Sequence, residues 1–191
     1  MKKAAYGTLR TSPGSPLPFG ARPNGKGTQF SAFSRNATAV SLLLFDSPQA
    51  STPVREIELD PRLNRTGDVW HVQVDGAGPG AFYLYRVDGP WQPEAGHRFD
   101  PRRLLLDPYV KAVAGSFEWN PRADGAGAMP KGIIVADDFD WRGDRPLARP
   151  LRFTTIYETH VRGLTLSPTS GVAHPGTFRG VVEKIPYFVD L

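Results

Sequence analysis

Short runs in which apolar and polar side chains alternate fill the first half of the chain. Turn-forming residues separate the runs, for example Asn24-Gly25 before the first and Asp88-Gly89-Pro90 after the last. Short strands with regular turn signals predict an antiparallel β-sandwich, which we place at residues 28–115. The runs are TQFSAFS at 28–34, AVSLLLFD at 39–46, EIEL at 56–59, VWHVQV at 69–74 and AFYLYRV at 81–87.

Two runs are apolar without alternation. Residues 40–45 are apolar at nearly every position, which is typical of a central strand covered on both faces. Residues 104–106, LLL, lie between Pro101 and Pro108, which exclude a long helix. We therefore expect an ordered segment there that crosses and packs on the sandwich. Trp70 lies inside a strand run and is expected in the core or half-buried.

The periodicity changes after residue 150. Residues 154–165, TTIYETHVRGLT, begin with β-branched and aromatic side chains and predict a strand that ends before Gly163. Residues 176–191, GTFRGVVEKIPYFVDL, repeat apolar side chains at helical spacing, and Thr177 is suited to cap the helix. A strand, a loop and a helix in this order form the opening unit of an alternating β/α fold. Because one such unit closes neither a sheet nor a barrel, we expect the front part of a larger protein.

Proline and glycine mark the remaining boundaries. Residues 1–27 are rich in both and are expected to be an N-terminal extension that leads into the sandwich. Residues 116–150 have the composition of a linker, with one short strand candidate at 132–135, and we expect this linker to pack on the sandwich. Trp119 and Trp141 flank the linker and are expected to anchor it there.

The composition excludes several classes of protein. With 191 residues, 40% of them apolar and 11% aromatic, the chain suffices for a packed core. Cysteine is absent, which excludes disulfides and thiolate metal sites and favours a cytoplasmic location. No stretch suits a signal peptide or a membrane helix, so we expect no membrane partner. The net charge is +4, but the arginines are scattered and paired locally with acids, so we expect no nucleic-acid partner.

Three polar clusters have alternative interpretations. Glu158 and His160 share one face of a strand and could be a metal pair, an acid–base pair or a structural hydrogen-bonded pair; with no third ligand nearby, we favour the structural pair. The DDFD cluster at 137–140 lacks the glycine and distal glutamate of a calcium loop and is expected to be a solvated loop. GAGPG at 76–80 contains a proline and precedes a strand, which argues against a nucleotide site. We expect no metal and no cofactor.

Six segments carry a family pattern: PFGARPNGKGTQFSAFSRNATAVSLLLFD, VWHVQV, YRVDGPW, HRFDPRRLLLDPYVKAV, IYETHVRGLT and GTFRGVVEKIPYFVDL. Together they resemble the N-terminal part of isoamylase-type glycogen debranching enzymes, which are glycoside hydrolases of the α-amylase superfamily. The resemblance implies an immunoglobulin-like sandwich related to glycogen-binding modules, followed by a (β/α)8 catalytic barrel. It also implies retaining hydrolysis of α-1,6 branch linkages by an Asp nucleophile and a Glu acid/base, with glycogen or a related branched α-glucan as partner.

The resemblance supplies no catalytic residue to this chain. Retaining hydrolysis needs two carboxyl groups about 5 Å apart at the ends of barrel strands, and a barrel takes about 250 residues. The acidic residues of the family lie on later strands that this sequence does not contain, so we expect the 191-residue chain alone to be inactive. Residues 151–191 correspond to the first strand and helix of a truncated barrel, whose remainder would be a partner. The structural motif of the family comprises Tyr157, Glu158, His160, Arg162 and Gly163.

Trp91 is the candidate glucan-binding residue. It follows the turn VDGP, which would expose its indole, and the apolar faces of sugar rings stack on such flat side chains. Related glycogen-binding modules have a stacking Trp in a similar DG-x-W arrangement, but their second Trp has no counterpart in LLLFDSPQAS. The alternative for Trp91 is packing against the barrel or the linker. The alternative for the whole chain is a stand-alone α-glucan-binding or scaffolding module without enzymatic activity, which would end near residue 115.

Overall fold

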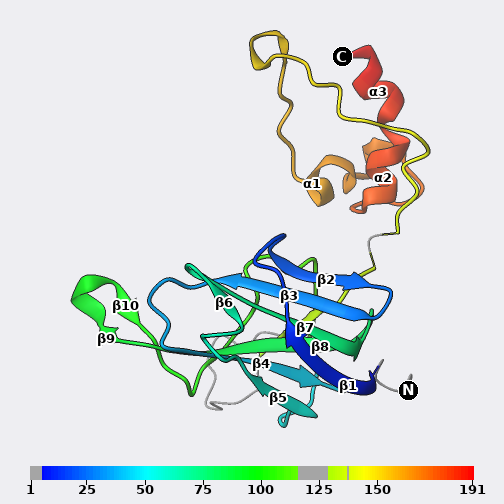
Figure 1. Ribbon diagram of the computed structural model, residues 1–191. Coiled ribbons are helices and arrows are strands. Elements are labelled where there is room, and N and C mark those ends of the chain that lie inside the picture. Colours follow the sequence, from blue (N-terminus) through cyan, green and yellow to red (C-terminus); the bar gives the residue numbers. More distant parts are fainter. Residues whose placement is uncertain (1–5, 116–128, 137) are drawn as a thin grey trace. The chain divides into compact units, whose positions relative to one another are not determined.

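The computed structural model of the protein describes residues 6–115, 129–136 and 138–191 (Figure 1). The chain divides into two compact units, Met1–Phe139 and Asp140–Leu191. The first unit consists of antiparallel sheets, and the second contains short helices. Each unit is described by itself.

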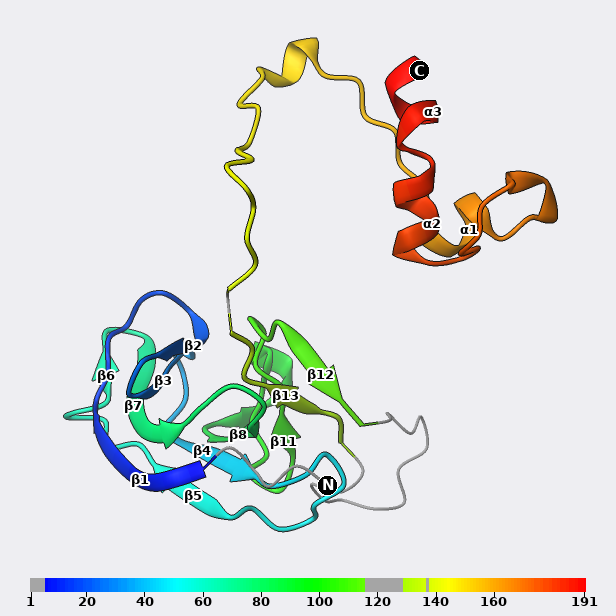
Figure 2. The same cartoon turned by 90° about the vertical axis from the view of Figure 1, so that its right-hand side faces the viewer.

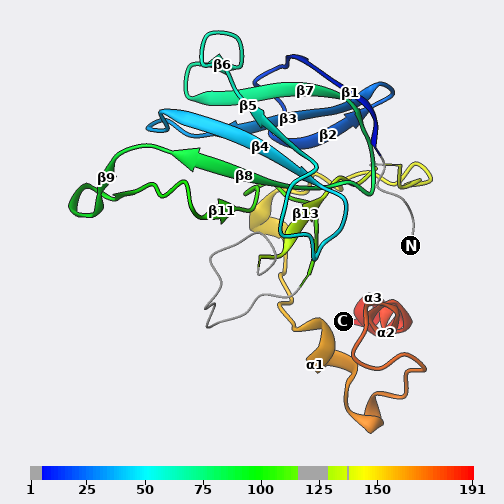
Figure 3. The ribbon, with the colours of Figure 1, turned by 90° about the horizontal axis from the view of Figure 1, so that it is seen from below.

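The first unit is a sandwich of two antiparallel sheets, seen as stacked layers in Figure 3. One sheet has the order β1-β7-β3-β2, with β6 also paired to β7, and the other has the order β12-β13-β8-β4-β5, with β11 paired to β8. Strand β13 lies between β12 and β8, and Figure 2 shows β12 and β13 side by side. The first sheet contains β1 (Tyr6–Pro13), β2 (Gly20–Asn24), β3 (Gly27–Phe33), β6 (Arg65–Thr66) and β7 (Val69–Ala77). The second contains β4 (Ala39–Phe45), β5 (Arg55–Glu58), β8 (Phe82–Asp88), β11 (Leu104–Leu105), β12 (Ala112–Ala114) and β13 (Lys131–Ile133).

The strands predicted from alternation are confirmed as β3, β4, β5, β7 and β8. The predicted tight turn at Asn24-Gly25 is also confirmed, because Asn24 pairs with Gly27 across the β2–β3 hairpin. The strands follow from the pleat, which places every second side chain on the same face of the sheet, and the turn follows from the preference of Asn-Gly for tight hairpins.

Strand β4 is covered on both of its faces, as its apolar run predicts. Leu42 and Leu44 belong to the main core between the sheets, while Leu43 and Phe45 belong to a second cluster on the outer face. All four are 0% exposed. Trp70, predicted to be core or half-buried, is 1% exposed and lies in the main core.

Strands β1 and β2 were not predicted, because they lie in the segment expected to be a lead-in. Both are edge strands of their sheet. An edge strand tolerates polar side chains and proline because one of its sides makes no ladder hydrogen bonds, and Pro23 lies in β2. The Tyr6 hydroxyl of β1 donates to the carbonyl oxygens of Phe45 (2.6 Å) and Phe82 (3.1 Å), and so ties one sheet to the other.

The segment after β8 packs on the sandwich, as the proline-bounded LLL run predicts. Strand β11 pairs with β8, and Leu104 is 8% exposed within the outer cluster. The short strand candidate at 132–135 is present as β13. Trp119 lies outside the described residues. Trp141 belongs to the second unit and is 65% exposed.

The strand predicted over residues 154–165 is absent. Thr154 and His160 have extended backbone angles, yet no ladder forms between them, and the short helix α1 (Val161–Thr165) follows. A parallel strand takes its hydrogen bonds from neighbouring strands, and the described part of the second unit contains none. The strand prediction was therefore wrong, because pattern alone does not supply the partner strands that a ladder needs.

The helix predicted over residues 176–191 is confirmed in two pieces, α2 (Phe178–Glu183) and α3 (Ile185–Asp190). The predicted cap is also confirmed, because the Thr177 hydroxyl accepts from the Gly180 N–H at 3.2 Å. The break at Lys184 precedes Pro186, whose ring cannot continue a helix that has already begun. Figure 2 shows α2 and α3 following one another almost in line.

Candidate functional site

A hairpin leaves the sandwich directly after β8 and carries Trp91. It consists of β9 (Trp91–Gln92), the 3-10 turn η1 (Pro93–Ala95) and β10 (His97–Arg98), and it projects from one end of the sandwich (Figures 1 and 3). Gly96 closes the turn with φ 83°, and its N–H donates to the Pro93 carbonyl at 3.1 Å. Glycine adopts this left-handed conformation without steric cost. We call residues 91–98 the Trp91 hairpin.

The base of the Trp91 hairpin is fixed to the sandwich. A Cβ atom on Gly89 would lie 2.7 Å from the Phe99 ring and 2.9 Å from the Asn36 carbonyl oxygen, so only glycine fits there. Phe99 is half-buried and packs against the main core. Just before the hairpin, the Thr38 N–H donates to the Asp88 carbonyl at 2.9 Å. The sandwich therefore positions the hairpin through its own packing.

The Trp91 side chain is 63% exposed, in contrast to the buried Trp70. Within the described residues, its indole has no hydrogen bond and no aromatic partner. The flat ring is therefore available for stacking on an apolar surface such as the face of a sugar. No second tryptophan is present in β4 or in the β4–β5 connection, residues 39–54.

Charged side chains surround the groove next to the hairpin. The groove has a volume of about 250 Å³ and is lined by Val87, Gly96, Arg98, Phe99, Asp100, Arg103 and Leu105. Asp100 accepts from the Arg102 Nε at 2.9 Å and pairs with the Arg103 Nε at 3.6 Å. These bonds, led by the one from Arg102, hold the pKa of Asp100 below its ordinary value. This Arg–Asp cluster was not predicted; the signal that could have indicated it is the charged run HRFDPRR after the Trp91 turn.

A buried carboxyl group lies under the segment that follows the hairpin. Asp107 is 1% exposed and accepts from the Tyr83 hydroxyl and from the Tyr109 N–H, both at 2.8 Å. Burial raises the pKa of Asp107, although these two bonds and the charge of Arg22 oppose the rise. The Asp107 carboxyl group thus joins the crossing segment to β8 and has a structural role.

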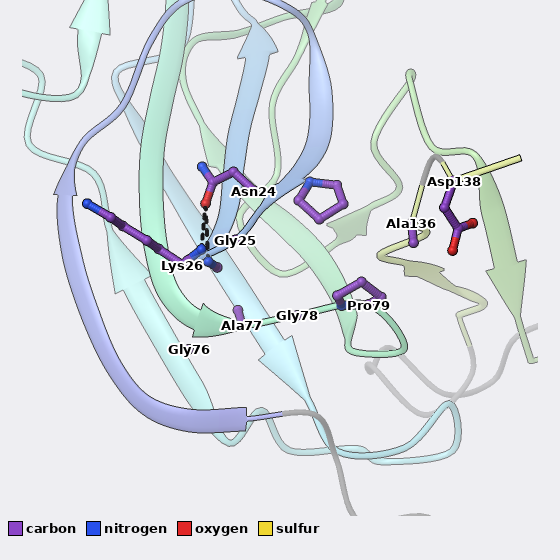
Figure 4. Close-up of a pocket in the computed structure, with 11 residues that line it drawn as sticks. Asn24, Gly25, Lys26, Gly76, Ala77, Gly78, Pro79, Ala136 and Asp138 are labelled. Carbon is purple, nitrogen blue, oxygen red and sulfur yellow. Dashed lines mark hydrogen bonds between the residues drawn. The ribbon is translucent and has the colours of Figure 1, made fainter. Parts of the chain in front are cut away.

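Another groove, of about 420 Å³, lies between the β2–β3 turn and the β7–β8 connection (Figure 4). The Asn24 side chain in this groove is already engaged, because its Oδ1 accepts from the Lys26 and Gly27 N–H groups and its Nδ2 donates to Gln73 at 2.9 Å. Glycine, alanine and proline make up most of the rest of the lining. We assign no chemistry to this groove.

A third groove, of about 360 Å³, lies on the outer face of β4, β5 and β8. Its lining includes the ion pair of Arg86 with Glu56, whose nitrogen and oxygen are 3.4 Å apart. Arg86 and Glu56 are each partly exposed, so the attraction is screened by solvent.

The family-motif residues lie in the second unit, where a hydrogen bond joins two of them, His160 and Gly163. The His160 Nδ1 accepts from the Gly163 N–H at 3.1 Å and caps α1. The Tyr157 ring lies 6.0 Å from that of Phe188, and a hydrogen bond with Tyr157 raises the pKa of Tyr187. The side chains of Arg162 and Glu158 are exposed, and no hydrogen bond joins Glu158 to His160.

Two further contacts in the second unit escaped the sequence analysis. The Thr165 side chain is buried and accepts from the Gly176 N–H at 2.9 Å, which closes the loop between α1 and α2. The Glu183 carboxylate accepts from the Ala173 N–H and pairs with the His174 Nδ1 at 2.9 Å, and these bonds lower the pKa of Glu183. Neither contact forms a cleft.

Metal-binding geometry is not found among the residues that the structure describes, since no three His, Asp or Glu side chains converge. In the acidic DDFD cluster, Asp138 lines the groove of Figure 4 and Asp140 accepts from the Arg142 N–H at 2.8 Å. Asp137 lies outside the described residues. The helices of the described chain are all too short or too polar to cross a membrane.

Comparison with known proteins finds a matching family model and relatives that are much longer than this chain. The model described as carbohydrate-binding module 48 (isoamylase N-terminal domain) matches residues 18–110, a range that includes the Trp91 hairpin. The chain is 40% identical to isoamylase 1, chloroplastic, of Oryza sativa subsp. japonica over 194 aligned residues, which cover 98% of this chain and 24% of the rice protein. It is 44% identical to a glycogen debranching enzyme of Yersinia pestis bv. Antiqua (strain Angola) over 162 residues, which cover 80% of this chain and 24% of the other.

A solved structure has a similar fold. It is the catalytic module of the multi-modular glycogen-degrading pneumococcal virulence factor SpuA in complex with an inhibitor, with a TM-score of 0.61 and 23% sequence identity. The match covers 94% of this chain and 26% of that one. This chain thus spans about a quarter of the length of the curated relatives, 24% in both cases.

Proposed function

We propose that the sandwich binds α-glucan through Trp91, because residues 18–110 match the model of carbohydrate-binding module 48 and the chain is 40% identical to an isoamylase and 44% identical to a glycogen debranching enzyme. The observation that carries the proposal is the exposure of this one indole, 63%, on a hairpin whose base is fixed by Gly89 and Phe99. A rigid aromatic platform loses little conformational entropy when a sugar ring stacks on it.

The experiment is electrophoresis of the 191-residue chain in native gels cast with and without glycogen. Glycogen should retard the chain, and Trp91→Ala should abolish most of the retardation. Trp141→Ala is the matched control, because Trp141 is also exposed, at 65%, but lies in the other unit. Equal mobility of the parent and Trp91→Ala in glycogen gels would reject Trp91 as the binding residue.

We further propose that these 191 residues form the N-terminal part of a glycogen debranching enzyme. That enzyme would hydrolyse α-1,6 linkages in the cytoplasm. In this proposal residues 151–191 provide the first strand and helix of a (β/α)8 barrel, and residues 154–160 become a strand when other strands of the barrel flank them. The extended and unpaired backbone there, with Ile156 75% exposed and Val189 82% exposed, supports the proposal.

Hydrolysis requires two carboxyl groups about 5 Å apart on barrel strands. We therefore expect these 191 residues alone to release no reducing sugar from glycogen above a buffer control. Release at a steady rate that scales with the concentration of the purified chain would contradict this expectation.

A stand-alone α-glucan-binding module is the second candidate. The observation in its favour is that the first unit closes its own core, with a main cluster between its two sheets. In that case glycogen binding would be the complete activity of the chain.

A further inference from the structure

We infer that Arg98 is a second glucan-contacting residue, which binds the hydroxyl groups of the sugar next to the one that stacks on Trp91. The groove beside the Trp91 hairpin would receive this second sugar. The inference rests on the proposed binding of α-glucan at Trp91 and deepens it, since a platform of one ring alone does not distinguish a sugar from another flat apolar group.

The register of the hairpin places Arg98 beside Trp91. Arg98 is paired directly with Trp91 across the two strands, and His97 is paired with Gln92. Side chains of directly opposed residues project from the same face of an antiparallel pair, with Cβ atoms about 4.5–5.5 Å apart. Trp91 and Arg98 therefore share one face of the hairpin, whereas Gln92 and His97 share the other.

Arg98 differs from the other arginines of this segment in its partners. Arg102 and Arg103 both bond to Asp100. Arg98 is exposed, and in the described part of the chain its guanidinium makes no hydrogen bond or ion pair. A guanidinium group offers five N–H donors in a planar fork, which suits the oxygen atoms of adjacent sugar hydroxyls. A sugar can therefore bind to the Arg98 guanidinium without first breaking a hydrogen bond between that group and another described residue.

The groove next to Arg98 has the chemistry of a sugar site. Val87, Phe99 and Leu105 provide apolar lining, and Arg98, Asp100 and Arg103 provide charged groups. The Asp100 carboxylate retains acceptor capacity for a sugar hydroxyl, because each ionised oxygen accepts about two hydrogen bonds. Asp100 offsets the charge of Arg103, but Arg98 leaves the lining with a net positive charge, so an anion is the competing ligand that the test has to separate from a sugar.

The test is calorimetric titration of the 191-residue chain and its variants with maltoheptaose. Arg98→Ala should raise the Kd about 10-fold, the effect of losing hydrogen bonds to a charged group, and Arg98→Lys should restore part of the affinity. Gln92→Ala is the control from the opposite face of the same hairpin and should leave the Kd unchanged. All of these side chains are exposed, so the urea midpoint of each variant should equal that of the parent.

The outcomes separate this inference from the proposed function. If Trp91→Ala weakens binding while Arg98→Ala does not, the role of Arg98 is rejected and the function of Trp91 stands. If neither variant changes the Kd, both are rejected. If inorganic phosphate competes with maltoheptaose in the parent but not in Arg98→Ala, Arg98 belongs to an anion site and its assignment to sugar hydroxyls is wrong.

Discussion

The two units of the chain bury their apolar side chains to very different extents. In the first unit, residues 42–45 on the central strand are all 0% exposed. In the second, Phe178 and Val189 on the helices are 77% and 82% exposed, and the buried residues of its α-helices are Thr165 and Gly180. The first unit thus closes a core of its own. The second unit is held in its local conformation by helix-capping and loop hydrogen bonds instead. An ordered backbone alone does not identify a self-sufficient domain. The burial of apolar side chains in a common core does.

The largest expected effect comes from the core of the sandwich. Leu44→Ala removes a fully buried side chain and should lower the free energy of unfolding by about 2–5 kcal/mol. The matched change in the second unit, Val189→Ala, should lower it by at most about 0.5 kcal/mol. Urea denaturation followed by tryptophan fluorescence measures both. Equal losses in the two variants would mean that the second unit is packed as tightly as the first.

An intermediate effect is expected at the buried carboxyl group. Tyr83→Phe removes a hydroxyl that donates to Asp107 and should cost about 1–3 kcal/mol at pH 7. Tyr85→Phe is the control, because the buried Tyr85 hydroxyl has no hydrogen-bond partner among the described residues; this variant should be neutral or slightly more stable.

The pH dependence of the same pair has a definite sign. Because the pKa of Asp107 is raised in the folded state, its stabilising contribution is fully present below the ordinary carboxyl pKa. That contribution is lost as the pH rises through the raised value. Tyr83→Phe raises the pKa of Asp107 further, so its cost should grow with pH across this range. A cost that is constant from pH 3 to pH 7, as measured by urea denaturation, would contradict an ionised Asp107 in the fold.

The smallest effect is expected at the cap of α2. Thr177→Ala removes the acceptor for the Gly180 N–H and should lower the local stability of the helix by about 1 kcal/mol, and Thr177→Ser should restore it. Hydrogen exchange at the amides of α2 reports the change. The urea midpoint of the sandwich should stay constant, and a shift in that midpoint would show that the two units unfold together.

Sequence pattern predicted the strands whose own side chains determine burial. The alternation in β3, β7 and β8 and the apolar run in β4 each indicate which faces are covered, and the structure confirms them. The Thr177 cap was predictable for a related reason, because a helix cap depends on residues only a few positions apart.

Pairing partners could not be predicted in the same way. Strands β1 and β2 are polar edge strands with a weak pattern, and residues 154–160 form no strand. At the candidate site, the turn before Trp91 predicted exposure, but the pairing of Arg98 with Trp91 depends on the register of the hairpin. Register is determined by the length and geometry of the turn, which the prolines and glycines around residue 93 do not specify uniquely.

The central claim is that both the independent core and glucan binding reside in residues 1–139. The most direct test is glycogen affinity electrophoresis of a chain that ends at Phe139, beside the full 191-residue chain. We expect a cooperative urea transition for the shortened chain and the same retardation by glycogen as for the full chain. A shortened chain that folds but migrates unretarded, while the full chain is retarded, would place the binding site in residues 140–191 and contradict the account.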